Sequence, residues 1–226
     1  MLREDPQLGE RQRHFADNIW ASGDQLLGLV NDVLDVAKME SGQVEVRLSD
    51  FSIELVIATQ CDVVRSLAEK KNISLSYSVP PGLPPVHLDQ ERVQRILTNL
   101  LSNAIKFTPE GGVVQVLLTV DKGNSEELDP QTASFVIQVR DTGVGIPEEE
   151  LQTIFEKFRQ GSSAIGVDMT TREHSGTGLG LSIVRETCRL LHGDVSVQSA
   201  LGAGSTFTVR LPWKISPKPV REEIVF

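Results

Sequence analysis

The sequence predicts an α+β fold, a two-layer α/β sandwich in which helices cover one face of a mixed sheet, preceded by one long helix. In several long segments, apolar residues recur at three- and four-residue intervals, which is the period of amphipathic helices. Several shorter segments are apolar or alternate between apolar and polar residues, as strands do. Strands alternate with helices early in the chain and come in pairs later, an order that differs from that of a doubly wound nucleotide fold.

The long helix is expected over residues 10–40. Its apolar stripe lies opposite charged and amide residues, and Ser41 with Gly42 supplies a stop signal. The stripe consists of Phe15, Ile19, Leu26, Leu27, Val30, Val33, Leu34 and Ala37. Because one helix cannot bury its own stripe, we expect it to pack on a partner helix in this chain or in another.

The first half of the sandwich is expected to start after Gly42. A strand from Val44 to Phe51 precedes a helix over 53–71 and a strand over 73–79, which the turn-rich segment PPGLPP ends. Asp89 is a good N-cap for the next helix, which carries the apolar series Val93, Ile96, Leu97, Leu100, Leu101 and Ile105.

The second half is expected to hold most of the strands. Strands over 113–120 and 134–140 flank a polar hairpin loop, and a short helix over 148–158 follows Pro147. Residues 159–176 have no period and form a long loop. A helix over about 178–192 ends at Gly193, strands over 194–199 and 204–211 close the domain, and residues 214–226 are a linker or tail.

Composition excludes several classes of protein. With 31 acidic and 22 basic residues, the net charge of -9 argues against a general nucleic-acid surface. No run of about 18 apolar residues could cross a membrane, and the N-terminus has no apolar signal core. Cys61 and Cys188 have neither metal-type spacing nor a disulfide framework. We therefore expect a soluble, cytoplasmic chain that makes no membrane contact of its own.

The segment NLLSNAIKFTPEGG holds the first candidate site. Asn99, Asn103 and Lys106 are spaced by four and three residues, so they share one face of the helix that begins after Asp89. A carboxamide oxygen is a hard ligand that suits Mg²⁺, and a lysine one turn further can reach a phosphate. The alternative is the ordinary polar face of a surface helix.

Two further segments follow the strand at 134–140. In DTGVGIPEEE, Asp141 closes the strand and two glycines allow a tight turn, so that Asp141 could accept a hydrogen bond from an exocyclic amine. The alternative is a glycine turn with Asp141 as its local cap. In IFEKFRQ, Phe155 and Phe158 stand beside Lys157 and Arg159, and packing on the core explains the aromatic residues equally well.

The segment GTGLGLSI is the fourth candidate. Gly176, Gly178 and Gly180 precede an apolar helix, whose unpaired N–H groups and positive dipole end would attract an anion. The segment is neither a P-loop nor a dinucleotide fingerprint, because the spacing and the preceding strand are absent. One such cluster of glycines is weak evidence by itself.

Together and in this order, the four segments resemble the nucleotide-binding catalytic domain of sensor histidine kinases, whose superfamily includes gyrase, Hsp90 and MutL. The resemblance covers about residues 10–212 and includes the closing GAGSTFTVRLP. It implies the Bergerat-type ATP fold over residues 43–213. It also implies that residues 1–42 are part of a dimerisation and phosphoacceptor domain, namely its second helix.

The resemblance also implies a role for each candidate residue. Asn103 is the expected Mg²⁺ ligand, and Asn99 and Lys106 lie near the phosphates of ATP. Asp141 accepts the adenine amine, Phe107 lines the adenine pocket, and Thr206 lies near that pocket. The remaining expected nucleotide contacts, in the pocket turn and in the lid over the triphosphate, are Gly143, Gly145, Ile146, Phe158, Gly176, Thr177, Gly178, Leu179 and Gly180. The lid segment SSAIGVDMTTREHS is longer than in many relatives, which leaves its nucleotide contacts open.

Asn99 separates the branches of the superfamily. The ATPases carry a glutamate there that activates water, whereas an amide is a poor general base. This favours a protein-histidine kinase that transfers the γ-phosphoryl group to another nucleophile. The acceptor histidine would lie on a first helix that does not occur in this sequence, so we expect no autophosphorylation by the usual route.

Further partners follow from the same resemblance. They are a response regulator and a second copy of the chain, bound through residues 10–40, while a longer parent protein could carry a membrane anchor. Two alternatives remain open: a superfamily ATPase or serine kinase, and an interaction module that binds no nucleotide.

Overall fold

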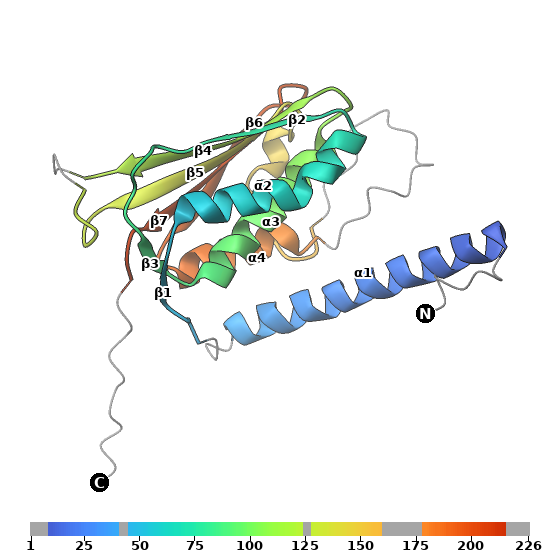
Figure 1. Ribbon diagram of the computed structural model, residues 1–226, viewed down its shortest axis with the longest axis horizontal. Coiled ribbons are helices and arrows are strands. Elements are labelled where there is room, and N and C mark those ends of the chain that lie inside the picture. The colour runs from blue at the N-terminus through green and yellow to red at the C-terminus, as the bar shows by residue number, and fades with distance from the viewer. Residues whose placement is uncertain (1–8, 41–44, 124–127, 160–177, 216–226) are drawn as a thin grey trace, which may run out of the picture. The chain divides into compact units, whose positions relative to one another are not determined.

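The structure is a computed structural model that describes residues 9–40, 45–123, 128–159 and 178–215 (Figure 1). The chain divides into two compact units, Met1–Val44 and Glu45–Phe226. The first unit is the helix α1 (Glu10–Glu40), as predicted. Large apolar side chains along it are exposed: Phe15, Ile19, Trp20, Leu26, Leu27, Val30, Val33 and Leu34. The stop signal at Ser41 and Gly42 lies outside the described residues.

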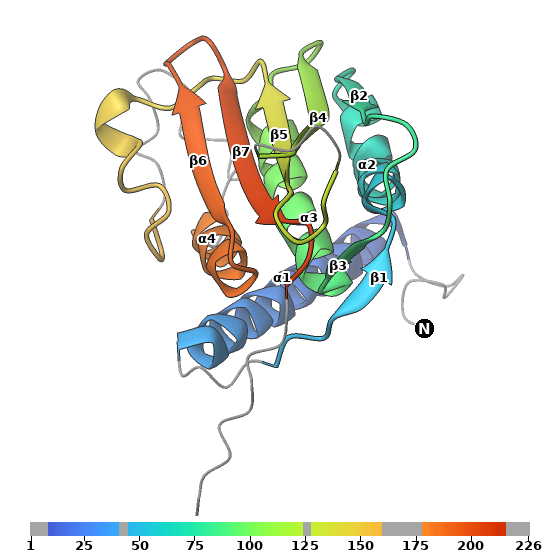
Figure 2. The same cartoon turned by 90° about the vertical axis from the view of Figure 1, so that its left-hand side faces the viewer.

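The second unit is built on a five-stranded mixed sheet. Its strands are β2 (Ser74–Ser78), β4 (Val113–Asp121), β5 (Ser134–Asp141), β6 (Asp194–Ser199) and β7 (Ser205–Pro212). They lie side by side in the order β2-β4-β5-β7-β6 (Figure 2). Only β2 and β4 run parallel, and the other pairs are antiparallel. The mixed sheet of the prediction is therefore confirmed.

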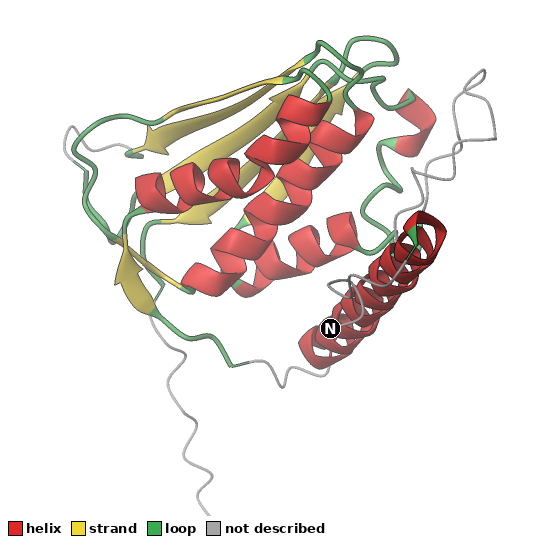
Figure 3. Cartoon of the chain, turned by 45° about the vertical axis from the view of Figure 1, so that its right-hand side comes forward, coloured by secondary structure: helices red, strands yellow, loops and turns green. Residues whose placement is uncertain are grey.

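Three helices cover one face of this sheet: α2 (Ile53–Lys70), α3 (Gln90–Phe107) and α4 (Gly180–Leu190) (Figure 3). The side chains of Ser52 and Asp89 cap the first two by accepting from the N–H groups of Leu55 and Arg92. Alternate residues of β4 are buried against the helices, and α3 buries its predicted apolar series. The two-layer α+β sandwich is confirmed.

A small second sheet lies beside the first. The predicted strand from Val44 to Phe51 is formed only as β1 (Ser49–Phe51), which pairs antiparallel with β3 (Val86–Leu88). The strand β3 was not among the strands expected from the sequence. A three-residue strand is too short to show an alternating pattern, so only its partner reveals it.

The predicted helix over 148–158 is also shorter than expected. A 3₁₀ turn covers Glu148–Glu150, and single turns follow. Phe155 packs edge-on against Phe207 of β7, with ring centroids 6.4 Å apart. Phe155 is thus buried against the sheet, although it lies in a turn and not in the helix that was expected.

The described end of the domain extends beyond its expected limit at residue 213. Trp213 is fully buried, its ring Nε1 donates to Pro85 O at 3.0 Å, and its ring packs edge-on against Phe135. Ile215 is also buried, and its N–H donates to the carbonyl of His87. Residues 214–215 therefore pair with β3, and Ile215 belongs to the core.

Among the described residues, no helix combines the length and the apolar character that a bilayer crossing needs.

Candidate functional site

Two carboxamides of α3 face the first residue of α4. The Asn99 Nδ2 group donates to the carbonyl of Arg95 at 3.0 Å, which turns Asn99 Oδ1 away from the helix. A Cβ atom placed on Gly180 would lie 3.0 Å from Asn99 Oδ1 and 4.0 Å from Asn103 Nδ2. The predicted residues Asn99, Asn103 and Gly180 are therefore brought together, and a side chain at position 180 would require the Asn99 amide to shift by a few tenths of an ångström.

The start of α4 lies beside these amides. Leu179 is its N-cap and makes no side-chain capping bond. The first turn of a helix carries N–H groups without helical partners and the positive end of the helix dipole. Leu179 itself is fully buried, and the hydroxyl of Ser182 donates to its carbonyl at 2.8 Å. The start of α4 is thus held by the burial of Leu179 and by the hydrogen bond from Ser182.

Gly178 and Phe158 meet just before α4. Gly178 has φ +70, and a Cβ atom there would lie 2.8 Å from the carbonyl carbon of Phe158. Phe158 has φ +59 and is 65% exposed. The chain segment after Phe155 therefore returns to the start of α4. The predicted lid residues Gly176 and Thr177 lie outside the described residues.

The C-terminal turn of α3 carries Lys106 and Phe107. The Lys106 ammonium lies 4.9 Å from the centroid of the Phe107 ring, within the range of a cation–π contact. Partial burial lowers the pKa of Lys106. The ring of Phe107 is 45% exposed, so it offers an apolar surface beside a cation.

Asp141 ends β5 in a partly buried position. Its Oδ1 accepts from the N–H of Gly143 at 2.8 Å and from the N–H of Ser205 at 3.2 Å. Burial raises the pKa of Asp141, and these two hydrogen bonds act in the opposite direction. With Oδ1 held by the backbone, the other carboxylate oxygen has no donor among the described residues, which leaves it available to a ligand.

The turn after Asp141 is packed against the end of α3. The N–H of Val144 donates to the carbonyl of Phe107 at 3.2 Å, and a Cβ atom on Gly143 would lie 2.7 Å from that oxygen. Gly145 has φ +72, and a Cβ atom there would lie 2.0 Å from the carbonyl of Ala200. Both glycines are required, because the carbonyl of Phe107 approaches Gly143 and the carbonyl of Ala200 approaches Gly145 too closely for a side chain.

Two serines that were not among the predicted site residues, Ser199 and Ser205, complete the turn. Ser199 Oγ accepts from the N–H of Ile146 at 2.9 Å, donates to the carbonyl of Gly204 at 2.8 Å, and lies 3.0 Å from Ser205 Oγ. Ser205 is the cross-strand partner of Asp141, whereas the predicted Thr206 pairs with Arg140. The period of two in strands could have indicated Ser205, since neighbours in a strand face opposite sides.

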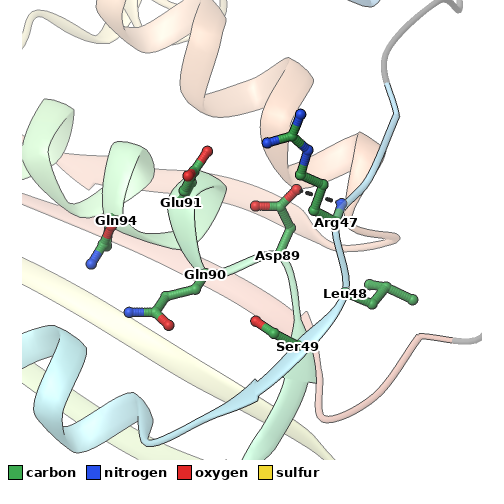
Figure 4. A pocket seen from close by; sticks show the side chains of 7 residues that line it. All are labelled: Arg47, Leu48, Ser49, Asp89, Gln90, Glu91 and Gln94. Carbon is green, nitrogen blue, oxygen red and sulfur yellow. Dashed lines mark hydrogen bonds between the residues drawn. The ribbon is translucent and has the colours of Figure 1, made fainter.

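A separate hollow lies between β1 and the start of α3. It has a volume of about 400 Å³ and is lined by Arg47, Leu48, Ser49, Asp89, Gln90, Glu91 and Gln94 (Figure 4). None of these is a predicted site residue. Asp89 is buried there, but its carboxylate is used by the N–H groups of Arg47 and Arg92. Asn99, Asn103 and Asp141 do not line this hollow.

The described residues contain no group of three or more His, Cys, Asp or Glu side chains that could hold a metal. Cys61 and Cys188 are buried free thiols, and burial raises their pKa values to about 11 and about 12. The candidate donors for a hard ion on the described face of α3 are the amide oxygens of Asn99 and Asn103. A hard ion that keeps several waters fits such a donor set.

A family model described as histidine kinase-, DNA gyrase B-, and HSP90-like ATPase matches residues 88–215. Hybrid signal transduction histidine kinase B of Dictyostelium discoideum is 38% identical over 91% of this chain and 10% of its own length. The autoinducer 2 sensor kinase/phosphatase LuxQ of Vibrio cholerae is 37% identical over 97% of this chain and 24% of its own length. The chain thus spans a quarter or less of these relatives.

A solved structure extends the likeness to three dimensions. Full-length ShkA, in a crystal structure with AMPPNP, is 31% identical with a TM-score of 0.75, covering 97% of this chain and 42% of ShkA. The matched family region includes α3, the Asp141 turn and α4, which carry the geometry described above. The chain belongs to the histidine kinase-, DNA gyrase B- and HSP90-like ATPase family, and its region 88–215 is an ATPase-type catalytic domain of the kind found in sensor histidine kinases.

Proposed function

We propose that the domain formed by residues 45–215 binds MgATP and transfers the γ-phosphoryl group to a histidine outside these 226 residues. The observation that carries the proposal is the convergence of the Asn99 and Asn103 carboxamides on Gly180, the first residue of α4. Family membership supports it, as does the likeness to ShkA, whose crystal structure contains AMPPNP.

The adenine end of the nucleotide would bind at Asp141. A carboxylate with one oxygen held by two backbone N–H groups can accept a hydrogen bond from an exocyclic amine with the other oxygen. The half-exposed ring of Phe107 and the side chain of Ile146 would provide apolar surface beside the base. Ser205 and Ser199 keep the turn in place and would act through Asp141 rather than on the base.

The triphosphate would lie between α3 and the start of α4. The N–H groups of the first turn of α4 would donate to phosphate oxygens, and Lys106 would supply a positive charge. Asn103 would hold Mg²⁺ through its amide oxygen. The ion would supply charge neutralisation on the phosphates. Gly178 and Gly180 would let the backbone approach the phosphates closely.

The reaction would be transfer rather than hydrolysis, because no general base stands at Asn99. By the resemblance, the acceptor lies on a first helix ahead of residues 10–40, and none of the chain's four histidines precedes that segment. His14 is exposed on α1, His87 is hydrogen-bonded to Asp50 at 2.8 Å, and His192 has φ +58 at the end of α4. His174 lies outside the described residues. The resemblance also suggests a response regulator and a second copy of α1 as partners.

The binding step is tested by titrating a fluorescent ATP analogue into the chain with Mg²⁺ and then with a chelator. We expect saturable binding that Mg²⁺ strengthens. Asp141→Asn, which keeps the shape of the side chain, should weaken binding of adenine nucleotides. Absence of binding to the wild-type chain would leave an interaction module as the better description.

The transfer step needs a second experiment. Labelled ATP is incubated with the chain alone, and with a separately supplied helix that carries an acceptor histidine. Acid-labile label on the added helix supports a histidine kinase. Strong label on the chain alone refutes the assignment of the acceptor to another segment. Steady release of phosphate or label on serine would instead indicate an ATPase or a serine kinase.

A further inference from the structure

The ammonium group of Lys71 caps the C-terminal end of α3. Lys71 follows α2 directly and is partly buried. Its Nζ donates to the carbonyls of Ile105 at 2.8 Å, Lys106 at 3.0 Å and Thr108 at 2.8 Å. An ammonium has three donors, so all three are used. A positive charge at this place also interacts favourably with the negative end of the helix dipole.

With Lys71 in place, each of the last four carbonyls of α3 has a partner. A helix leaves these groups without helical donors. The carbonyl of Ala104 accepts from the N–H of Thr108 at 3.0 Å and from its hydroxyl at 2.6 Å. Lys71 serves the next two carbonyls, and the carbonyl of Phe107 accepts from the N–H of Val144. Lys71 and the Asp141 turn therefore hold the same helix end from two sides.

The position of Lys71 is itself determined by backbone contacts. Its N–H donates to the carbonyl of Ala68 at 3.1 Å, and its carbonyl accepts from the N–H of Gly111 at 3.1 Å. Asn72, with φ +52, donates from its side chain to Glu110 at 2.7 Å. The ammonium thus projects from a turn that is tied to the loop after α3.

We propose that Lys71 is a positioning residue for the nucleotide site. It does not reach the proposed ligand but sets the last turn of α3, on which Lys106, Phe107 and the Val144 hydrogen bond depend. The proposal rests on the proposed function, since it states what that site needs. Without the ammonium, the partly buried carbonyls of Ile105 and Lys106 lose their donor, and the last turn would loosen.

The test compares Lys71→Met with two controls. Lys70→Met removes the same charge from the neighbouring exposed lysine. Val86→Ala opens a cavity in β3, which precedes the opposite end of α3, and so lowers stability without touching the last turn. For each chain, Kd for Mg-ATP is measured well below its Tm, and hydrogen exchange of the Val144 amide is measured without nucleotide.

We expect Lys71→Met to raise Kd about tenfold, which corresponds to the free energy of about one hydrogen bond to a charged group. We also expect faster hydrogen exchange of the Val144 amide. Lys70→Met should change neither, and Val86→Ala should lower Tm while leaving Kd within about twofold. An unchanged Kd in Lys71→Met refutes the proposal. An equal rise in Val86→Ala also refutes it, because general destabilisation would then explain the loss.

Lys71→Arg is a second variant, which keeps the test possible if the Lys71→Met chain does not fold. A guanidinium keeps the charge but spreads its donors in a plane, so it cannot direct three bonds from one atom. Its Kd should lie between those of wild type and Lys71→Met, and a wild-type Kd refutes the proposal. If the wild-type chain binds no nucleotide, the proposed function fails, whereas exchange at Val144 still decides whether Lys71 sets the turn.

Discussion

Gly180→Ala should separate stability from nucleotide affinity. Gly180 is the first residue of α4, has no positive φ, and faces the two carboxamides of α3. The added methyl would lie 3.0 Å from Asn99 Oδ1, a few tenths of an ångström closer than an ordinary contact. The amide of Asn99 must therefore move, although its Nδ2 group is held by the carbonyl of Arg95 at 3.0 Å.

Two effects on stability nearly cancel. Alanine is favoured over glycine by about 0.5–1 kcal/mol in a helix interior, and by no more than this at Gly180, the first residue of α4. Shifting the Asn99 amide weakens one hydrogen bond, which is worth about 1 kcal/mol. The free energy of unfolding should therefore change by less than about 0.5 kcal/mol. The methyl also fills space beside the proposed Mg²⁺ and phosphate positions, so Kd for Mg-ATP should rise about tenfold, or roughly 1.4 kcal/mol.

The assay pairs urea unfolding with calorimetric titration of Mg-ATP. Gly28→Ala is the matched control, because Gly28 lies within α1 and a Cβ atom there meets nothing within 4 Å. It should show the gain in helix stability alone, with unchanged Kd. A Gly180→Ala chain that binds Mg-ATP as tightly as wild type would show that the carboxamide pair does not face the nucleotide.

Three further predictions concern the two ends of the proposed site. Nucleotide affinity should fall as pH decreases, because an ionised Asp141 is needed to accept the adenine amine. Burial raises the pKa of Asp141, so the fall should begin at a higher pH than for an exposed aspartate; Asp141→Asn should flatten this profile in a fluorescence titration. Asn103→Ala should remove most of the Mg²⁺ dependence of binding, seen as equal Kd values with Mg²⁺ and with a chelator. Gly204→Ala should lower unfolding free energy by about 2 kcal/mol or more, measured in urea, because Gly204 has φ +80 and its Cβ would lie 2.0 Å from the carbonyl of Asp141.

Local patterns predicted the long elements well. In the helices α1, α2 and α3, apolar residues recur with a helical period over many residues. The segments of β4 and β5 are long, rich in apolar residues and without a helical period, so they were recognised as strands. Asp89 was identified as a cap because its role depends on neighbours within three residues. Where the signal was short, prediction failed: β3 has three residues, and the turns after Glu148 resemble a helix only in their aromatic spacing.

In the candidate site too, the residues whose proximity depends on one element were predictable, and those that meet across elements were not. Asn99 and Asn103 share a face because α3 has a fixed period, so their proximity could be read from the sequence. Ser205 could not be identified with the same ease, because its contact with Asp141 spans the β5–β7 pairing. Lys71 gave no signal in the sequence, since a lysine after a helix is ordinary on a surface.

The sequence by itself determined which chemical groups the candidate site offers: amides in place of a general base, an aspartate at a strand end, and glycines before a helix. These depend on residue type and on spacing within one element. Only the tertiary structure decided which groups meet, namely Gly180 with the amides, Ser205 with Asp141, and Lys71 with the end of α3. The physical reason is that buried backbone groups must find hydrogen-bond partners wherever the packing of helices on the sheet brings donors, and that packing joins residues far apart in the chain.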